Sequence, residues 1–250
     1  MKKKENKELV ENKTPLQIEK DILYVKVNSE KIRKNRIWLN IAAAIVVGIL
    51  LLLSLVYGVV YVVNETGNFT ISLDPNLQRT SLISISPYSD FSYTSLTLKA
   101  KSLEYMDNIS GDWIPEDIHE KYEGEHSQNN YIAYSFFVKN FGDESTSYET
   151  IINITSVIKN VDEAVRVAVY HNDKKTVYAK ISKKTSMPEE GTTMFESSKC
   201  VMRNVVKNFE AGKMDKYTVV IWLEGDDPEC VDDILGGELK LKMDIHENVT

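Results

Sequence analysis

The densest run of acidic side chains lies near the C-terminus. After Gly225, the segment that ends at Asp233 holds five carboxylates within eight residues. Calcium binds about six to eight oxygen ligands, so closely spaced carboxylates suit it. The sequence therefore predicts calcium as the one candidate cofactor, with the ligands Asp226, Asp227, Glu229, Asp232 and Asp233. The spacing is not that of an EF-hand and Pro228 restricts the loop, so the alternative is an ordinary solvated turn.

Histidine and carboxylate side chains gather in a second segment. His119 and Glu120 are adjacent, with Glu116, Glu123 and His126 nearby. A zinc peptidase of the His-Glu-x-x-His type needs two imidazoles on one helical face, one turn apart. His119 and His126 would lie two turns apart on a helix, too far for a single ion. We therefore expect an exposed acidic segment here.

Other arrangements typical of catalysis are missing from the sequence. There is no Gly-x-Ser-x-Gly motif and no glycine loop that would bind phosphate. Trp222 and the tyrosines on predicted strands are expected in the core or an interface, with a carbohydrate platform as the alternative. The sequence thus predicts a protein that is not an enzyme.

The two cysteines, Cys200 and Cys230, both lie in the strand-rich part of the chain. If residues 200–209 and 217–224 formed a hairpin, Cys230 would come close to Cys200. A disulfide between them would stabilise the fold by about 3–4 kcal/mol in the chain-entropy model. We predict this bridge, the alternative being two reduced thiols.

An apolar run from Ile41 to Val63 contains 23 residues without a charge. As a helix it would reach about 34 Å, enough for one membrane crossing, so residues 37–63 are predicted as a transmembrane helix. The basic residues just before it are expected at the membrane surface: Lys31, Arg33, Lys34 and Arg36. This asymmetry predicts a cytoplasmic N-terminus and an extracellular domain over residues 64–250.

The alternative for the apolar run is a cleaved secretory signal, whose apolar core is about 7–15 residues long. The run is longer than that, and residues 59–67 contain no Ala-x-Ala cleavage pattern. We therefore expect an uncleaved anchor. Small residues four apart, Ala44 with Gly48 and Ser54 with Gly58, are a hint of self-association in the membrane.

Charge divides the chain in the same place. The chain has 30 basic and 37 acidic groups, of which 11 and 6 lie in the tail of residues 1–36, leaving 19 and 31 elsewhere. The net charges are thus +5 and −12. A basic tail beside an anionic leaflet gains roughly 1 kcal/mol per residue near the surface. The predicted partner of the tail is therefore the membrane, and the acidic remainder argues against nucleic acid.

Residues after Asn64 alternate with a period of two. In the segment Glu238 to His246 the apolar set faces one way and the polar set the other, as in a half-buried strand. About eight or nine such strands, separated by turn residues, predict a mainly β domain. We expect an antiparallel β-sandwich of the Ig-like or jelly-roll type, with a closed barrel as the alternative.

Three segments resemble the TasA and camelysin group of Gram-positive surface proteins and their uncharacterised membrane-anchored relatives. These are residues 131–143 with the turn Lys139-Asn140-Phe141-Gly142, residues 162–170, and residues 216–230. The resemblance implies an Ig-like fold and a bacterial cell surface. TasA-type proteins have a removable signal where this chain has an apparent anchor, so fibre formation is not implied.

These features predict a membrane-anchored surface protein that acts by binding or assembly in the cell envelope, with an envelope protein or a second copy as partner. One alternative is a transmembrane sensor whose tail contacts a cytoplasmic partner. The other is a metal-dependent surface hydrolase.

Overall fold

A computed structural model describes residues 14–64, 68–74 and 82–248. The chain divides into two compact units, Met1–Asn64 and Glu65–Thr250, which we describe separately. The first 13 residues of the predicted tail lie outside the described residues.

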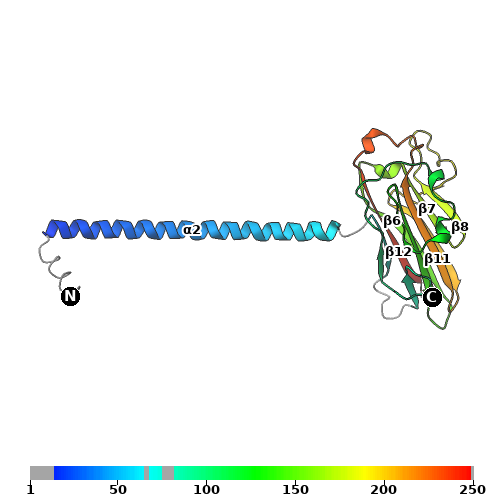
Figure 1. The fold of residues 1–250 in the computed structure, drawn as a ribbon, viewed down its shortest axis with the longest axis horizontal. Coiled ribbons are helices and arrows are strands. Elements are labelled where there is room, and N and C mark those ends of the chain that lie inside the picture. The colour runs from blue at the N-terminus through cyan, green and yellow to red at the C-terminus, as the bar shows by residue number, and fades with distance from the viewer. Residues whose placement is uncertain (1–13, 65–67, 75–81, 249–250) are drawn as a thin grey trace. The chain divides into compact units, whose positions relative to one another are not determined.

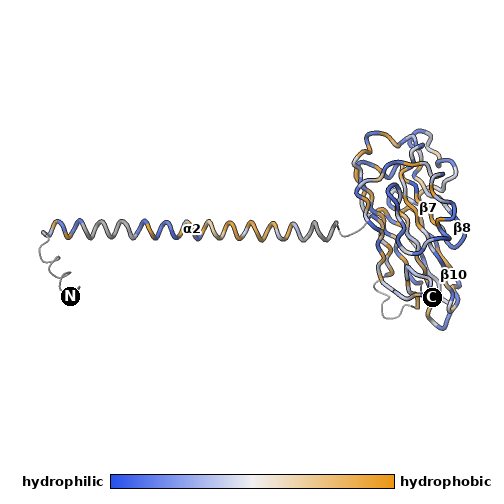
Figure 2. Tube along the Cα trace, in the orientation of Figure 1, coloured by the Kyte–Doolittle hydropathy of each residue, from blue (hydrophilic) through white to orange (hydrophobic). Residues whose placement is uncertain are grey.

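In the first unit the described residues form the helix α2 (Pro15–Asn64), drawn in Figure 1. Thr14 precedes it, and the Thr14 backbone N–H donates to Gln17 Oε1 at 3.3 Å, as in one half of a capping box. The stretch Ser29–Gly58 is long and apolar enough to cross a membrane, and Figure 2 shows its hydrophobic residues. The helix begins well before residue 37, because no glycine or proline interrupts the chain between Pro15 and Gly48.

The second unit is built on two sheets. The first has the order β10-β6-β12-β1-β3. Its strands are β1 (Phe69–Leu73), β3 (Thr97–Lys99), β6 (Thr146–Ile158), β10 (Cys200–Phe209) and β12 (Glu238–Asn248). β12 is antiparallel to β6 but parallel to β1. The C-terminal alternation is thus a central strand, whose apolar residues Leu241, Met243 and Ile245 lie in the core.

The second sheet has the order β2-β5-β11-β7-β8-β9, with β4 paired beside β5. Its strands are β2 (Ile83–Ser86), β4 (Gly124–Glu125), β5 (Tyr131–Asn140), β7 (Val165–His171), β8 (Lys174–Ala179), β9 (Thr193–Met194) and β11 (Met214–Leu223). β8 and β9 are parallel. Both sheets are therefore mixed. The expectation of purely antiparallel pairing was wrong at two pairs, because alternation in the sequence does not fix strand direction.

Short helices connect the strands: η2 (Gly111–Trp113), α3 (Ile118–Lys121), η3 (Val161–Glu163) and η4 (Asp232–Ile234). Side chains of both sheets meet in one apolar core that includes Phe69 of β1 and Phe136 of β5. A second cluster lies on the other face of the β5, β7 and β11 sheet, where Ile118 and its neighbours pack with Trp222.

The three central strands β5, β7 and β11 are therefore buried on both faces, which explains their continuous apolar runs. The described side chains of α2 are all exposed, and none belongs to either apolar cluster. The second unit thus contains its own core, so we expect residues 65–250 to fold without the helix.

Candidate functional site

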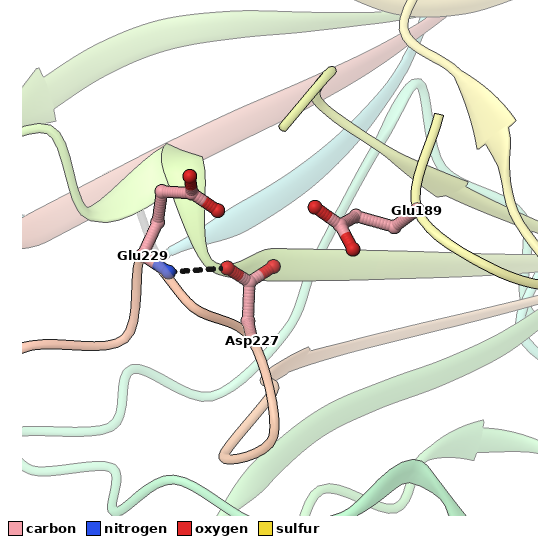
Figure 3. A group of neighbouring side chains, drawn as sticks. All are labelled: Glu189, Asp227 and Glu229. Atoms are coloured by element: carbon pink, nitrogen blue, oxygen red, sulfur yellow. Dashed lines mark hydrogen bonds between the residues drawn. The ribbon is translucent and has the colours of Figure 1, made fainter. Parts of the chain in front are cut away.

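Three carboxylates come together beyond the end of β11. Glu189, Asp227 and Glu229 each place one oxygen within 4.8 Å of the others, and Figure 3 shows the side chains gathered around a common space. Asp227 and Glu229 belong to the predicted calcium loop. Glu189 comes from the segment between β8 and β9. The sequence reasoning missed Glu189, because nothing in the sequence links it to a loop almost forty residues away.

Glu229 joins the two segments. Its backbone N–H donates to Asp227 Oδ1 at 2.8 Å, and its Oε1 accepts from the Lys183 backbone N–H at 3.2 Å. Glu229 Oε2 and Glu189 Oε1 are buried, and neither has a hydrogen-bond partner within the described part of the chain. Two carboxylate oxygens are thus left for another ligand, at the point where the two segments meet.

Arg166 of β7 supplies the positive charge beside this cluster. Arg166 Nη2 lies 2.7 Å from Asp227 Oδ2, and the two side chains are 6% and 0% exposed. Arg166 lies on the same face of β7 as Ala168, which belongs to the second apolar cluster, the one that contains Trp222. A buried charge must be paired, so this contact fixes the position of Asp227.

The cluster still carries an excess of negative charge, because one arginine faces three carboxylates. Burial raises the pKa of Glu229, and the neighbouring Asp227 and Glu189 carboxyl groups raise it further. Oxygens within 4.8 Å of one another can share one calcium ion, whose oxygen ligands lie at about 2.3–2.6 Å. The donor set therefore fits a divalent cation that prefers oxygen.

The remaining residues of the predicted calcium set lie elsewhere. Asp226, Asp232 and Asp233 are exposed, and the last two begin the short helix η4. They are not part of the three-residue group. On either side of Pro228, Asp227 is buried and Glu229 is half-buried, and the next residue, Cys230, packs against the core.

The structure differs from the sequence expectation at the cysteines, because Cys200 and Cys230 are both free thiols. The hairpin that would have brought them together does not exist. β10 pairs with β6 in one sheet, whereas β11 pairs with β5 and β7 in the other. The connection between β10 and β11 crosses from sheet to sheet. Burial raises the pKa of both thiols.

A buried polar network joins the two sheets elsewhere. The Tyr148 hydroxyl of β6 donates to Asp215 Oδ2 of β11 at 2.6 Å and lies 3.0 Å from the Tyr217 hydroxyl. His171 Nε2 is 3.3 Å from the same Asp215 oxygen, and Asn172 Nδ2 donates to Asp215 Oδ1 at 3.2 Å. His171 is the last residue of β7, and its position in the sequence suggested no role. Contacts between residues of different sheets cannot be predicted from residue spacing along the sequence.

This network changes the acidity of its members. Burial alone would raise the pKa of Asp215, but hydrogen bonds from His171, Tyr148 and Asn172 outweigh it and lower the pKa to about 2. Burial and the neighbouring Tyr217 and Asp215 raise the pKa of Tyr148. Asp215 is therefore a buried anion held by donors, and its role is structural.

The other candidate residues are dispersed. His119 stacks on Tyr170 with ring centroids 4.5 Å apart, and His126 stacks on Tyr122 at 5.0 Å. Trp222 is a core residue whose indole donates to Glu224 at 2.9 Å. The predicted membrane-surface residues lie along α2 and are exposed: Lys31, Arg33, Lys34 and Arg36.

No family model matches the chain, and no curated protein matches it. Among solved structures, the chain is similar to a β-glucosidase from Kluyveromyces marxianus in complex with glucose, at 11% identity and a TM-score of 0.25. The match covers 50% of this chain and 12% of the glucosidase chain. A TM-score this low supports no argument about fold or activity.

Proposed function

We propose that the protein is a single-pass membrane protein that acts by binding or assembly at the cell surface. One observation carries the proposal: a single helix with a long apolar stretch is joined to a β-rich unit that has its own core. The basic residues before the apolar stretch favour a cytoplasmic N-terminus and an extracellular second unit. Two sheets around one core support a β-sandwich of the Ig-like or jelly-roll type, as the resemblance to the TasA and camelysin group implies.

In this proposal the group of Glu189, Asp227 and Glu229 holds a calcium ion with a structural role. The ion would join the loop after β11 to the segment between β8 and β9. A rigid pair of loops on a β framework is a usual way to present a binding surface.

A sensor is the second candidate, and it has its own observation. α2 continues for 26 residues before the apolar run, from Pro15 to Asn40, so a helical arm is available to a cytoplasmic partner.

Purified protein that holds zinc tightly and cleaves peptides would instead favour the surface hydrolase.

Binding or assembly is testable on intact cells with a cross-linker that cannot enter them. We expect the tagged chain to form discrete adducts of higher mass, and a matched chain that ends at Asn64 to form none. Adducts that contain two differently tagged copies of the chain would indicate assembly. Adducts that contain only one of the two tags would indicate a separate partner. Absence of both kinds of adduct would contradict the proposal.

Calcium should raise the melting temperature of the protein at constant ionic strength. At a hundredfold excess over Kd the stabilisation is about 2.7 kcal/mol, or roughly 5–10 °C for a unit of this size. Glu189→Gln should abolish this shift while raising stability without calcium, because it removes one of three repelling charges. The matched control is Asp226→Asn, an exposed neighbour that should leave the shift intact. An unchanged melting temperature of the wild type would rule the ion out.

A further inference from the structure

A second site lies at the start of β10, and it shares no residue with the group of three carboxylates. It is a pocket of about 300 Å³. Its walls are residues 154–157 of β6, Asn160, Asp162, Lys180 and residues 198–199. This volume reaches the lower end of the range typical of sites for small ligands. Neither the proposed anchor nor the calcium group uses these residues.

The pocket opens where β6 loses a neighbour. β10 pairs with β6 as far as Asn153, whereas β12 continues along the other edge of β6 to Ile158. After the hydrogen bond from Ile154 N to Lys199 O, the strand is therefore paired on one side only among the residues that the structure describes. An unpaired strand edge presents backbone donors and acceptors. The pocket thus has polar groups of the main chain as well as of side chains.

Asp162 is the least exposed polar group of the pocket. The residue is only 2% exposed, and its Oδ2 lies 2.5 Å from Lys180 Nζ. Its Oδ1 is buried, and among the described residues it has no hydrogen-bond partner. Leaving a buried acceptor unpaired is costly, so this oxygen favours a ligand that brings a donor.

The pocket carries charges of both signs. Lys180 Nζ contacts Glu163 Oε1 at 3.0 Å in addition to Asp162, and Lys199 also lines the pocket. The Asp162 carboxylate would repel an anion, and the ammonium groups of Lys180 and Lys199 would repel a cation. The hydroxyl groups of Ser156 and Ser198 can donate and accept, whereas the Thr155 hydroxyl already donates to Lys240 O at 3.1 Å and can only accept. These features favour a neutral ligand with several hydroxyl groups.

Apolar residues complete the lining. Ile154 and Val157 belong to it, and Val157 is 40% exposed, so a C–H surface of a ligand can pack against it. A sugar ring combines such a surface with hydroxyl groups that donate and accept. We propose that this pocket binds one unit of a neutral saccharide, with Asp162 accepting a hydrogen bond from a ring hydroxyl. The inference rests on the proposed binding function, because it names the class of ligand.

The test uses the full chain in a detergent without a sugar headgroup. Glucose, galactose, mannose and N-acetylglucosamine are titrated in turn, and binding is followed by saturation-transfer NMR of the sugar. We expect at least one to bind, and Asp162→Asn to weaken it about tenfold, as for the loss of a hydrogen bond to a charged group. Ser198→Trp should fill the pocket and abolish binding. The matched control Ser145→Trp, in an exposed turn before β6, should not change it.

The inference is overturned if no sugar binds, if Ser198→Trp leaves binding unchanged, or if inorganic phosphate or methylamine binds more tightly than every sugar. If Asp162→Asn fails to fold, sugar binding by Ser198→Trp is the deciding measurement. Sedimentation of the protein with cellulose, compared with its binding of the free sugars, shows whether the ligand is part of a polymer or a soluble sugar. A protein that binds cellulose but none of the free sugars counts as a sugar-binding protein. These measurements do not depend on membrane orientation, so their failure leaves the surface proposal to the cross-linking test.

Discussion

Replacing Arg166 with methionine should destabilise the β-rich unit by about 3–5 kcal/mol, because Asp227 would remain buried without its positive partner. Methionine keeps much of the volume of the arginine stem, so the loss reports mainly the missing charge. The measurement is the free energy of unfolding from a urea titration at neutral pH without added metal. Because three carboxylates would then be uncompensated, added calcium should restore part of the loss.

Arg203→Met is the matched control. Arg203 pairs with Glu149 at 2.8 Å, almost the same distance, but its side chain is 47% exposed. Surface ion pairs contribute about 0–1 kcal/mol, so this variant should change stability little. Adding Asp227→Asn to Arg166→Met should recover stability by removing the unpaired charge. Equal losses from the two arginine variants would show that the Arg166 pair is not buried as described.

Asp215→Asn should cost roughly 2–3 kcal/mol at neutral pH, and the cost should depend on pH. The pKa of Asp215 is about 2 in the folded protein, below its ordinary value of 3.8. A lowered carboxyl pKa stabilises the fold above the unfolded pKa, and this stability is lost as pH falls through the folded value. The difference in unfolding free energy between wild type and variant should therefore shrink between about pH 5 and pH 2.

Asp173→Asn controls for a general effect of removing an acidic group, because Asp173 is exposed in the turn just beyond His171. We expect its stability to stay within about 0.5 kcal/mol of wild type at every pH. A difference between wild type and Asp215→Asn that stays constant from neutral pH to pH 2 would contradict the hydrogen-bonded anion.

Local pattern predicted much of the fold. The alternation in residues 238–246 predicted β12. Residues 131–140, which form β5, are rich in the aromatic and β-branched side chains that are typical of strands. Strand partners were harder to predict. Residues 200–209 and 217–224 are strands, but they belong to different sheets, because a short connection can cross between layers as easily as it can close a hairpin. The expected disulfide rested on that hairpin.

The candidate cation site was predictable only in part. Composition alone identifies the acidic loop that holds Asp227 and Glu229, but it does not separate them from the three other carboxylates of the loop. Glu189 and Arg166 reach the site from distant segments, so only the folded chain joins them to it. The same holds for Tyr148 and Asp215, which meet across the two sheets.

The central claim, that the β-rich unit lies outside the cell and the N-terminal tail inside, is tested most directly by thiol labelling. In a chain carrying Cys200→Ser and Cys230→Ser, one cysteine is placed at an exposed position of β10 by Lys207→Cys, or in the tail by Asn12→Cys. A maleimide that cannot cross membranes should label the first variant on intact cells, and the second only after the cells are permeabilised. Labelling of the tail cysteine on intact cells, with protection of the β10 cysteine, would contradict the proposed orientation.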